Sequence, residues 1–304
     1  MRVISVFGGS GFLGTELIKG LEEKKFKIRV FTRNKLQRQL KAFSNIDIIQ
    51  ITAKTDLQKL LHGSDIIIDL VGILHESKSS SFDEIHAKRV KEIISIASSS
   101  EVKRFIHVGA LGASSNAPSK YLRSKAKGEE FIREECVNCK WTIIKPSIIF
   151  GEKDKFVNLF YSMVKYLPIV LLVSPQAKFQ PIFVKDVVEI IIKSIDDKNT
   201  YNKTYAIGGP KTFSFIEIVK LIARFQKKNL WVLPLGKKLS YMLVRVIEFL
   251  PVKIITRDNL KSMSLDNTVK INDAYQFKAT LTTLNTCLLY TSDAANDRGC
   301  VDVG

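Results

Sequence analysis

The chain has 304 residues, 45% of them hydrophobic, with 16 glycines and 8 prolines, which excludes a disordered protein and favours one large domain or two unequal ones. Its formal net charge of +17 suits proteins that bind nucleic acids or anionic membranes. The basic residues are spread along the chain, however, and no block of five or more occurs, so we expect no nucleic-acid binding. An anionic membrane surface stays open as a partner.

The sequence contains no obvious targeting or membrane-spanning segment. The opening residues MRVISVFGGSGFLG begin a strand-and-loop pattern at once, without the apolar stretch and cleavage site of a secretory signal. The longest apolar runs, such as LPIVLLV at 167–173, are much shorter than the ~18 residues that cross a bilayer. We therefore expect a soluble or peripheral protein.

Predicted strands and helices alternate through the first half of the chain. Hydrophobic periodicity predicts strands at 2–7, 27–32, 65–72, 104–110 and 141–150, and helices at 11–24, 55–61, 81–98 and from 121 onward. Regular alternation of this kind builds a parallel sheet with helices on both faces. The sequence therefore predicts an α/β fold with a Rossmann-like doubly wound parallel sheet.

The alternation becomes less regular after Gly151. Residues 1–150 are expected to form a dinucleotide-binding Rossmann domain, to which residues 178–208 return with a strand and a helix. Residues 151–177 and 209–286 are expected to form a smaller, mostly helical C-terminal cap domain.

The last segment, 287–304, differs from the rest. Its opening residues, CLLYTS, match the translation of a transposon sequencing adapter, so we expect an artefact that adds nothing to the fold and replaces the natural sequence beyond about residue 286. Without this segment only Cys136 and Cys139 are left. Their CVNC spacing fits half a zinc site or a redox pair, but no second pair completes four ligands. We expect free thiols in a reducing cytoplasm and no metal site.

The clearest binding motif is the loop GGSGFLG, which lies between the first predicted strand and helix. Glycines suit this place because the turn needs unusual backbone angles, the chain must approach a pyrophosphate closely, and the helix packs tightly on the strand. The N-terminus of the helix then faces the negative charge. We expect the loop to bind a dinucleotide through Gly8, Gly9, Ser10, Gly11, Phe12, Leu13 and Gly14.

The end of the second strand indicates which dinucleotide binds. NAD-binding proteins place an acid there for the ribose 2′-hydroxyl, whereas this sequence has Thr32 and Arg33, with Lys35 just beyond. A guanidinium can pair with a 2′-phosphate through two hydrogen bonds, so NADP(H) is favoured over NAD(H). The alternative is that Arg33 is an ordinary solvated arginine.

Further motifs resemble a known family. They are VGIL at 71–74, HVGALGA at 107–113, YLRSKAKGE at 121–129, KPSIIFG at 145–151, FQPIFVKDV at 179–187 and YAIGGP at 205–210. With the glycine loop they resemble the atypical extended short-chain dehydrogenases/reductases, a group of NAD(P)-dependent epimerase/dehydratase-like proteins. Within it the chain is most similar to the alpha-subcomplex subunit 9 family, an accessory subunit of respiratory complex I. The resemblance covers about residues 2–275.

This resemblance implies a Rossmann-like fold that holds NADPH, peripheral attachment to a membrane complex, and no need for turnover. It also implies cofactor contacts at Val71, Gly72 and Pro146. In active relatives a tyrosine exchanges a proton with the substrate, and a lysine four residues later lowers the phenol pKa and holds the nicotinamide ribose. Tyr121 and Lys125 match this pair, in a residual catalytic or a cofactor-holding role. A purely structural pair one helical turn apart is the alternative.

The chain departs from the enzymatic pattern at the strand that precedes Tyr121. Active members carry a serine or threonine at its end to donate a hydrogen bond to the substrate, but Gly109 and Ala110 stand there. Losing one such donor typically costs ~10² to 10³ in rate. Ser114 and Ser115 come several residues later. Another departure is Gln50, which replaces the acid that many relatives carry near the adenine.

Two other features have simple interpretations. His75 and His86 are expected to be satisfied polar residues rather than catalysts. A helical apolar stripe headed by Lys237 and Lys238 is expected to pack in the core or cap, with a membrane-surface or partner-binding helix as the alternative. The stripe consists of Leu239, Met242, Leu243, Val246, Ile247 and Leu250.

Three functions fit these observations. The leading one is a non-catalytic NADP(H)-binding accessory subunit that joins other complex I subunits at the cytoplasmic side of a bacterial inner membrane. The alternative is a soluble cytoplasmic NAD(P)-dependent reductase, epimerase or dehydratase that acts on a nucleotide-sugar or ketone. A dinucleotide-sensing regulatory protein is the third, although such proteins usually lack Tyr-x-x-x-Lys. The sequence does not identify a substrate or an oligomeric state.

Overall fold

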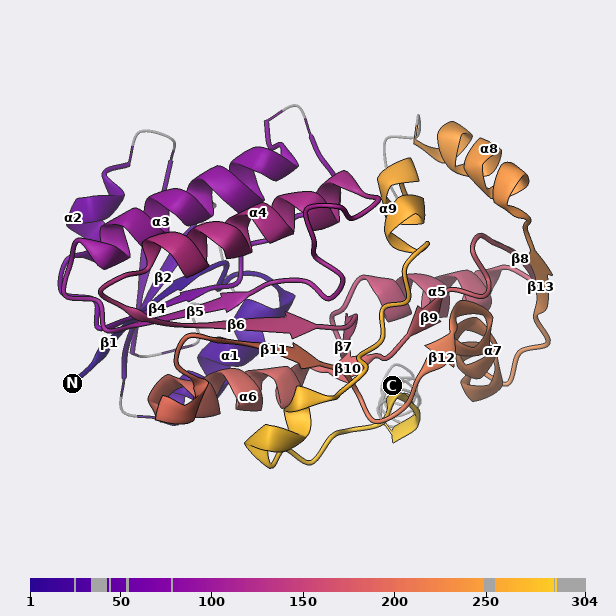
Figure 1. The fold of residues 1–304 in the computed structure, drawn as a ribbon. Coiled ribbons are helices and arrows are strands. Elements are labelled where there is room, and N and C mark those ends of the chain that lie inside the picture. Colours follow the sequence, from indigo (N-terminus) through magenta and orange to yellow (C-terminus); the bar gives the residue numbers. More distant parts are fainter. Residues whose placement is uncertain are drawn as a thin grey trace, which may run out of the picture.

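The main sheet of the protein has seven parallel strands (Figure 1). A computed structural model describes residues 1–24, 26–33, 43, 45–52, 55–77, 79–248, 255–286 and 288. The strand order is β11-β6-β5-β4-β1-β2-β3, and every neighbouring pair is parallel. The strands are β1 (Val3–Phe7), β2 (Lys27–Thr32), β3 (Ile46–Gln50), β4 (Ile66–Asp69), β5 (Arg104–Val108), β6 (Lys140–Pro146) and β11 (Lys203–Ile207). This confirms the predicted Rossmann-like sheet.

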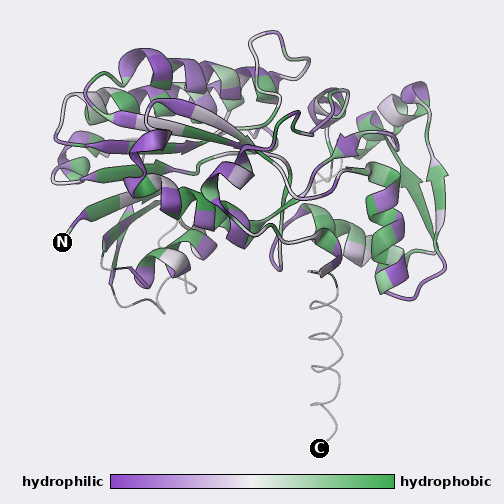
Figure 2. Cartoon of the chain, turned by 60° about the horizontal axis from the view of Figure 1, so that its bottom comes forward, coloured by the Kyte–Doolittle hydropathy of each residue, from purple (hydrophilic) through white to green (hydrophobic). Residues whose placement is uncertain are grey.

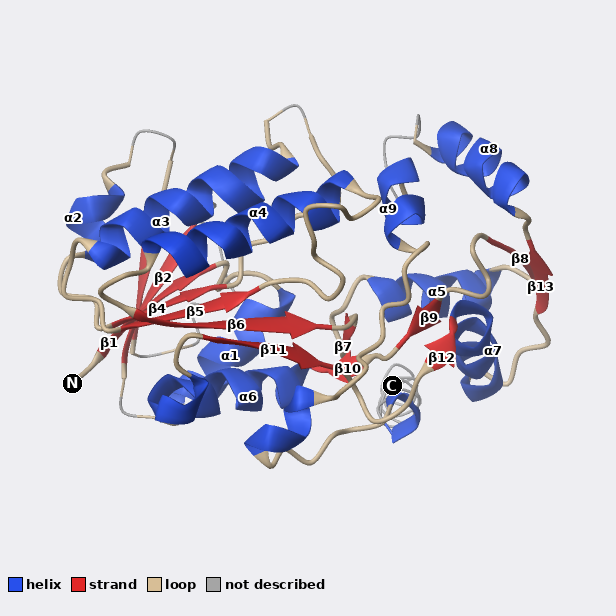
Figure 3. Ribbon diagram, in the orientation of Figure 1, coloured by secondary structure: helices blue, strands red, loops and turns tan. Residues whose placement is uncertain are grey.

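Helices cover both faces of the sheet (Figure 3). One face is covered by α1 (Phe12–Glu22) and α6 (Val184–Asp196), whose apolar side chains pack against those of β1 and β2. The opposite face is covered by α2 (Leu57–Leu61), α3 (Arg89–Ser98) and α4 (Lys120–Glu135). The π-helical turn η1 (Glu84–Lys88) leads into α3. Because side chains alternate along each strand, β1 contributes Ile4 and Val6 to one core and Phe7 to the other.

The cap packs around a cluster of aromatic side chains. Phe215 contacts the rings of Phe156, Phe160 and Phe179, with centroids 5.0 to 5.7 Å apart. The cap also contains three two-stranded sheets, formed by β7 with β10, β9 with β12, and β8 with β13. The cap elements are β7 (Ile149–Phe150), α5 (Phe156–Tyr166), β8 (Ile169–Leu172), β9 (Lys178–Phe179), β10 (Ile182–Phe183), β12 (Phe213–Ser214), α7 (Phe215–Phe225), β13 (Trp231–Pro234), α8 (Lys237–Ile247) and α9 (Arg257–Ser262).

The chain passes several times between the domain that contains the main sheet and the cap. Within residues 178–208, α6 and β11 complete the sheet domain, whereas β9 pairs with β12 of the cap. The 3₁₀ helices are η2 (Lys198–Thr200), before β11, and η3 (Asp273–Phe277). Ala274 and Phe277 of η3 pack into the sheet core, although they lie in the range expected to belong to the cap.

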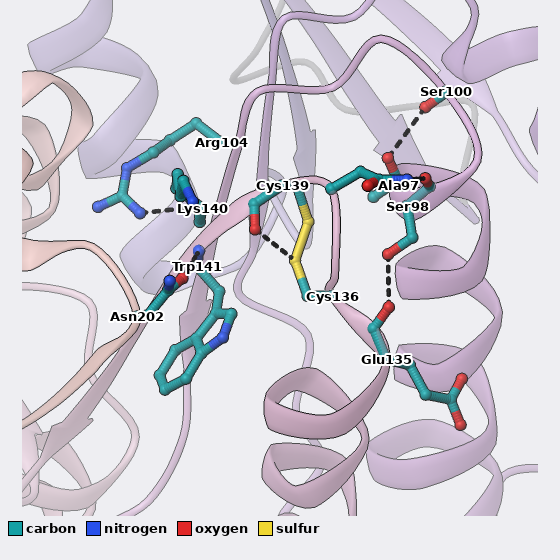
Figure 4. The surroundings of a disulfide bond; sticks show 11 residues. Ala97, Ser98, Ser100, Arg104, Glu135, Cys136, Cys139, Lys140, Trp141 and Asn202 are labelled. Atoms are coloured by element: carbon teal, nitrogen blue, oxygen red, sulfur yellow. Dashed lines mark hydrogen bonds between the residues drawn. A yellow bond between two sulfur atoms is a disulfide. The ribbon is translucent and has the colours of Figure 1, made fainter.

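The expectation of free thiols at Cys136 and Cys139 is wrong. In the structure the two sulfurs form a disulfide, with the Cα atoms 5.6 Å apart (Figure 4). The reason is local, because α4 ends at Cys136 and the chain turns directly into β6, which brings the two Cα atoms within the range that a disulfide spans. Both cysteines are buried against the α3 side of the sheet.

Leu288 is the only part of the segment 287–304 among the described residues. It is buried in the cap core with Leu284. The rest of this segment and Leu250 of the predicted apolar stripe lie outside the described residues. The expectation that residues 287–304 add nothing to the fold is therefore wrong at Leu288, and it stays a prediction for the residues of this segment that lie outside the described part.

Candidate cofactor-binding site

The glycine loop closes tightly between β1 and α1. Gly8 has a positive φ of 78°, and a β-carbon there would lie 3.1 Å from the backbone nitrogen of Val71. A β-carbon on Gly14 would lie 2.3 Å from the carbonyl oxygen of Gly8. Larger residues would therefore open the loop. Gly11 is the N-cap of α1, and no side chain forms a cap hydrogen bond there.

The sheet places most of the predicted contact residues at one edge. The strand order reverses at β1, which lies between β2 and β4, and ligands of such sheets bind outside the carboxyl ends of the strands at this reversal. The loop follows β1, Arg33 follows β2, and Val71 and Gly72 follow β4. Pro146 ends β6 at the same edge.

Two guanidinium groups lie near the end of β2. Arg33 is exposed, and its Nη1 donates a hydrogen bond to Ser80 Oγ at 3.2 Å. The guanidinium of Arg89 lies 5.4 Å from the ring centroid of Phe7, and its buried Nε has no hydrogen-bond partner among the described residues. Burial lowers the pKa of Arg89, and the charge of Arg33 adds to this effect although Asp69 opposes it. Sequence analysis missed Arg89, because only the fold brings it to this edge.

Neither β2 nor β3 ends in an acid. β2 ends at Thr32 and β3 at Gln50, whose Nε2 donates to the carbonyl oxygen of Arg33 at 3.2 Å. Gln50 therefore supports the backbone that carries Arg33. Lys35 lies outside the described residues.

Tyr121 and Lys125 occupy successive turns of α4, which begins with Ser119 as its N-cap. Lys125 Nζ donates hydrogen bonds to the carbonyl oxygens of Val71 at 3.2 Å and Val108 at 3.1 Å. Burial lowers the pKa of Lys125, although Asp69 and Glu129 oppose this. Burial and the charge of Glu129 raise the pKa of Tyr121 to about 12. The phenol is thus protonated at neutral pH.

A carboxylate lies beside the strand end where active relatives carry a hydroxyl. A β-carbon on Gly109 would lie 2.5 Å from Glu129 Oε1. The other carboxylate oxygen of Glu129 is 3.0 Å from Lys145 Nζ and 3.1 Å from Arg133 Nη2. Glu129 Oε1 is buried without a hydrogen-bond partner among the described residues. A side chain at position 109 therefore requires Glu129 to move.

Two serines follow Gly109 and Ala110 in the loop before α4. Ser114 and Ser115 are both exposed. The hydroxyl of Ser114 accepts a long hydrogen bond, 3.4 Å, from the backbone nitrogen of Asn116.

His86 is a buried, neutral positioning residue. Its Nε2 accepts a hydrogen bond from the backbone nitrogen of Ile73 at 3.0 Å, which leaves the proton on Nδ1 for donation to Ser124 Oγ at 2.9 Å. Burial, together with the charge of Lys125, lowers the pKa of His86 to about 3. Ser124 donates in turn to the carbonyl oxygen of Tyr121 at 2.8 Å. His86 thus fixes the loop after β4 to the helix that carries Tyr121.

A second buried pair lies beneath the site. Asp69 Oδ2 and His107 Nδ1 are 2.8 Å apart, and Asp69 Oδ1 accepts from the backbone nitrogen of Val71 at 3.1 Å. Burial alone would raise the pKa of Asp69, but the hydrogen bond and charge of His107, with the charge of Lys125, hold it below its usual value. The pair therefore fixes the strand end that holds Val71.

The cap closes over the N-terminus of α4. Asp258 of α9 accepts hydrogen bonds from the backbone nitrogens of Lys120 at 2.8 Å and Tyr121 at 3.0 Å. Beside this contact is a cavity of about 280 Å³. Its lining is mostly charged and consists of His75, Glu76, Phe82, Lys120, Glu248, Thr256, Arg257, Asp258 and Lys261.

The described part of the chain holds no group of three or more His, Cys, Asp or Glu side chains suited to a metal ion. In the same residues, no helix has the length and apolar character required to cross a membrane.

Comparison with protein families identifies the nucleotide-binding half of the chain. Residues 8–159 match the family described as NAD(P)H-binding, and they include the glycine loop and the segment with Tyr121 and Lys125. The chain belongs to this NAD(P)H-binding family. The match begins at Gly8, the residue whose positive φ shapes the loop.

Relatives of this NAD(P)H-binding chain confirm the narrower resemblance. It is 30% identical, over 75% of its length, to mitochondrial NADH dehydrogenase [ubiquinone] 1 alpha subcomplex subunit 9 of Dictyostelium discoideum. The protein of the same name from Mus musculus is 32% identical over 72% of the chain. The chain spans 66% and 60% of the lengths of these two relatives.

Solved structures confirm the fold of the whole chain. UDP-glucuronic acid 4-epimerase from Bacillus cereus, in complex with UDP-glucuronic acid and NAD, superimposes with a TM-score of 0.71. The match covers 98% of this chain and 100% of the epimerase, at 17% identity. At that identity, the likeness extends to the fold alone.

Proposed function

We propose that the protein is an NADP(H)-binding accessory subunit of respiratory complex I, bound peripherally at the cytoplasmic side of a bacterial inner membrane, and that its dinucleotide is structural. Two relatives that share about 30% of their aligned residues with it are named as subunits of that complex. The observation that carries the non-catalytic part is the lack of space at Gly109, where a β-carbon would lie 2.5 Å from Glu129 Oε1. It puts a carboxylate where an enzyme of this fold needs a hydroxyl donor.

The residues present fit a dinucleotide. The glycine loop leaves no room for a β-carbon on Gly14, and the uncapped N-terminus of α1 suits the pyrophosphate. Lys125 is held by Val71 and Val108 beside Gly72, where it would support the nicotinamide ribose. When bound, the cofactor would supply hydride-transfer chemistry.

The preference for NADP(H) rests on two cations. Arg33 is exposed at the end of β2 and can pair with a 2′-phosphate, and Arg89, whose buried Nε has no described partner, adds a second positive charge nearby. Neither β2 nor β3 ends in an acid that would hold a ribose 2′-hydroxyl or repel the phosphate. The proposal therefore assigns the phosphate to Arg33 and Arg89 together.

The second candidate function is an NAD(P)-dependent reductase, epimerase or dehydratase. It is favoured by the retained Tyr121 and Lys125 and by the charged cavity below α9, which has room for a small polar substrate. The raised pKa of Tyr121 and the absence of a hydroxyl donor at position 109 count against it.

A turnover assay tests the proposal. We expect purified protein to retain NADPH yet to oxidise it with nucleotide-sugars, ketones or quinones far more slowly than the ~1 s⁻¹ of an ordinary enzyme. If the wild type reaches that rate and Tyr121→Phe abolishes it, the site is catalytic. The Tyr121→Phe protein is a suitable control because it keeps the ring and loses only the hydroxyl.

A further inference from the structure

The strand pair β8 and β13 exposes apolar side chains at the end of the cap farthest from the main sheet (Figure 1). Ile169 lies opposite Trp231 and Leu171 opposite Leu233, and all four side chains are exposed, Trp231 by 72%. The alternate residues Val170 and Leu172 are buried. Because side chains of a strand alternate between faces, one face of the pair covers the cap core and the other faces outward.

Helix α8 follows β13 directly and also turns apolar side chains outward. Leu239, Met242 and Val246 are 59%, 65% and 67% exposed, whereas Ser240 and Val244 are buried. The exposed residues are three and four positions apart, so they share one side of the helix. Three residues of the predicted apolar stripe, Leu239, Met242 and Val246, therefore face solvent and do not pack in the core.

Figure 2 shows the same region by hydropathy, with largely hydrophobic strands at the end of the cap. Ten exposed side chains make up what we call the distal cap face, namely Tyr166, Leu167, Ile169, Leu171, Trp231, Leu233, Leu239, Tyr241, Met242 and Val246. Isolated exposed apolar residues are common on soluble proteins, but ten of them in the two short segments 166–171 and 231–246 indicate a binding surface.

The charges in these segments are all positive. Neither residues 157–173 nor residues 226–247 contain an aspartate or glutamate. The same segments carry six exposed basic residues, namely Lys165, Lys227, Lys228, Lys237, Lys238 and Arg245. The nearest acid in sequence is Glu248, which forms an ion pair with Arg257. These two segments therefore supply no acid with which to select a basic partner.

We infer that the distal cap face docks on an anionic lipid surface. Exposed Trp and Tyr with Leu, Ile, Met and Val suit the boundary between headgroups and acyl chains, where aromatic rings with a polar edge are favoured. The surrounding lysines and Arg245 match the negative headgroups, and long basic side chains reach them while their stems lie on apolar groups. In this orientation the main sheet and its dinucleotide site point away from the bilayer (Figure 1).

This inference is independent of the cofactor, since no residue of the distal cap face belongs to the dinucleotide site. It deepens the proposed peripheral attachment by assigning the surface that makes it. A protein partner of complex I is the competing occupant, and the experiment separates the two.

Vesicle flotation with the full chain tests the assignment. We expect wild type to float with vesicles of phosphatidylcholine and phosphatidylglycerol but much less with phosphatidylcholine alone, and added salt to weaken the binding. Trp231→Ser with Leu233→Ser removes apolar contacts, and Lys237→Glu with Lys238→Glu reverses charge. Each pair should lower vesicle affinity by about tenfold or more.

Matched controls lie on the sheet domain. Ile271→Ser changes a side chain that is 77% exposed, and Lys203→Glu reverses an exposed charge on β11. Both should bind vesicles as wild type does, and thermal unfolding of every variant establishes that it is folded. The inference is overturned if wild type ignores anionic vesicles, or if folded distal-face variants bind them as well as the controls do. If Trp231→Ser binds vesicles as wild type does but no longer copurifies with complex I subunits, the distal cap face binds a protein instead of lipid.

Discussion

Asp258 of the cap accepts a hydrogen bond from the backbone nitrogen of Tyr121 at 3.0 Å. This contact joins residues 137 positions apart in the chain and supplies a carboxylate to the first turn of α4, where free N–H groups favour negative charge. The cap therefore helps to hold the helix that carries both Tyr121 and Lys125.

Replacing Asp258 should loosen this connection. Asp258→Ala removes the acceptor of two backbone N–H groups, so we expect the free energy of unfolding to fall by about 1 to 2 kcal/mol. Asp258→Asn keeps one acceptor oxygen and should lose less. Chemical denaturation measures both changes. Asp266→Ala, at an exposed position, is the control, and an equal loss in that variant would show that the contact contributes nothing specific.

Restoring a serine at the strand end should destabilise the protein. Gly109→Ser and Gly109→Ala both add a β-carbon against Glu129, so each should cost about 1 to 3 kcal/mol of stability. Combining Gly109→Ser with Glu129→Ala removes the collision, so the double variant should lose less than the sum of the single losses. Additive losses in denaturation experiments would mean that the two residues do not interfere.

Much of the nucleotide-binding half was predictable because its signals are local. The glycine loop, the strands around it and the Tyr121–Lys125 spacing all depend on neighbouring residues. Other features depend on tertiary contacts. The edge strands β3 and β11 were not identified as strands, and Arg89 and Asp258 reach the site only through folding. The sequence shows that Gly109 stands where active relatives carry a hydroxyl. It does not show that Glu129 of α4 lies beside Gly109, because only the fold brings α4 to the end of β5.

The cofactor preference should depend on both arginines. Arg33→Ala and Arg89→Ala each remove a cation that we assign to the 2′-phosphate, so the dissociation constant for NADPH should rise about tenfold or more while that for NADH changes little. Isothermal titration of both nucleotides measures the two constants, and NADH serves as the internal control. The same ratio of the two constants in wild type and in both variants would refute the assignment.

Protonation of His86 should make the fold sensitive to mild acid. Its pKa falls from 6.5 to about 3 on folding, so the unfolded chain binds the proton more readily. His86 therefore does not lower the free energy of unfolding above pH 6.5. As pH falls from 6.5 toward 3, the free energy of unfolding declines by up to about 1.4 kcal/mol per pH unit. Urea unfolding at pH 7.5 and pH 5 should therefore show a smaller pH effect in His86→Gln than in wild type. The exposed His62 is the control, since His62→Gln should keep the wild-type pH effect.

Lys125 and Tyr121 should differ in their effects on the bound cofactor. Lys125→Ala removes the cation beside Gly72, so the protein should retain less NADPH and lose the stability that the ligand provides. Tyr121→Phe keeps the ring and should retain NADPH as wild type does. Nucleotide released from each purified protein on denaturation can be quantified directly, and equal losses in both variants would show that the Tyr121 hydroxyl holds the cofactor as much as Lys125 does.

Purification of the tagged chain from its own membranes tests the central claim most directly. The account predicts that complex I subunits are recovered with it, that NADPH is present in about equal amount to the chain, and that both survive Tyr121→Phe. Recovery of the chain alone from the soluble fraction, with no complex I subunits, would contradict it.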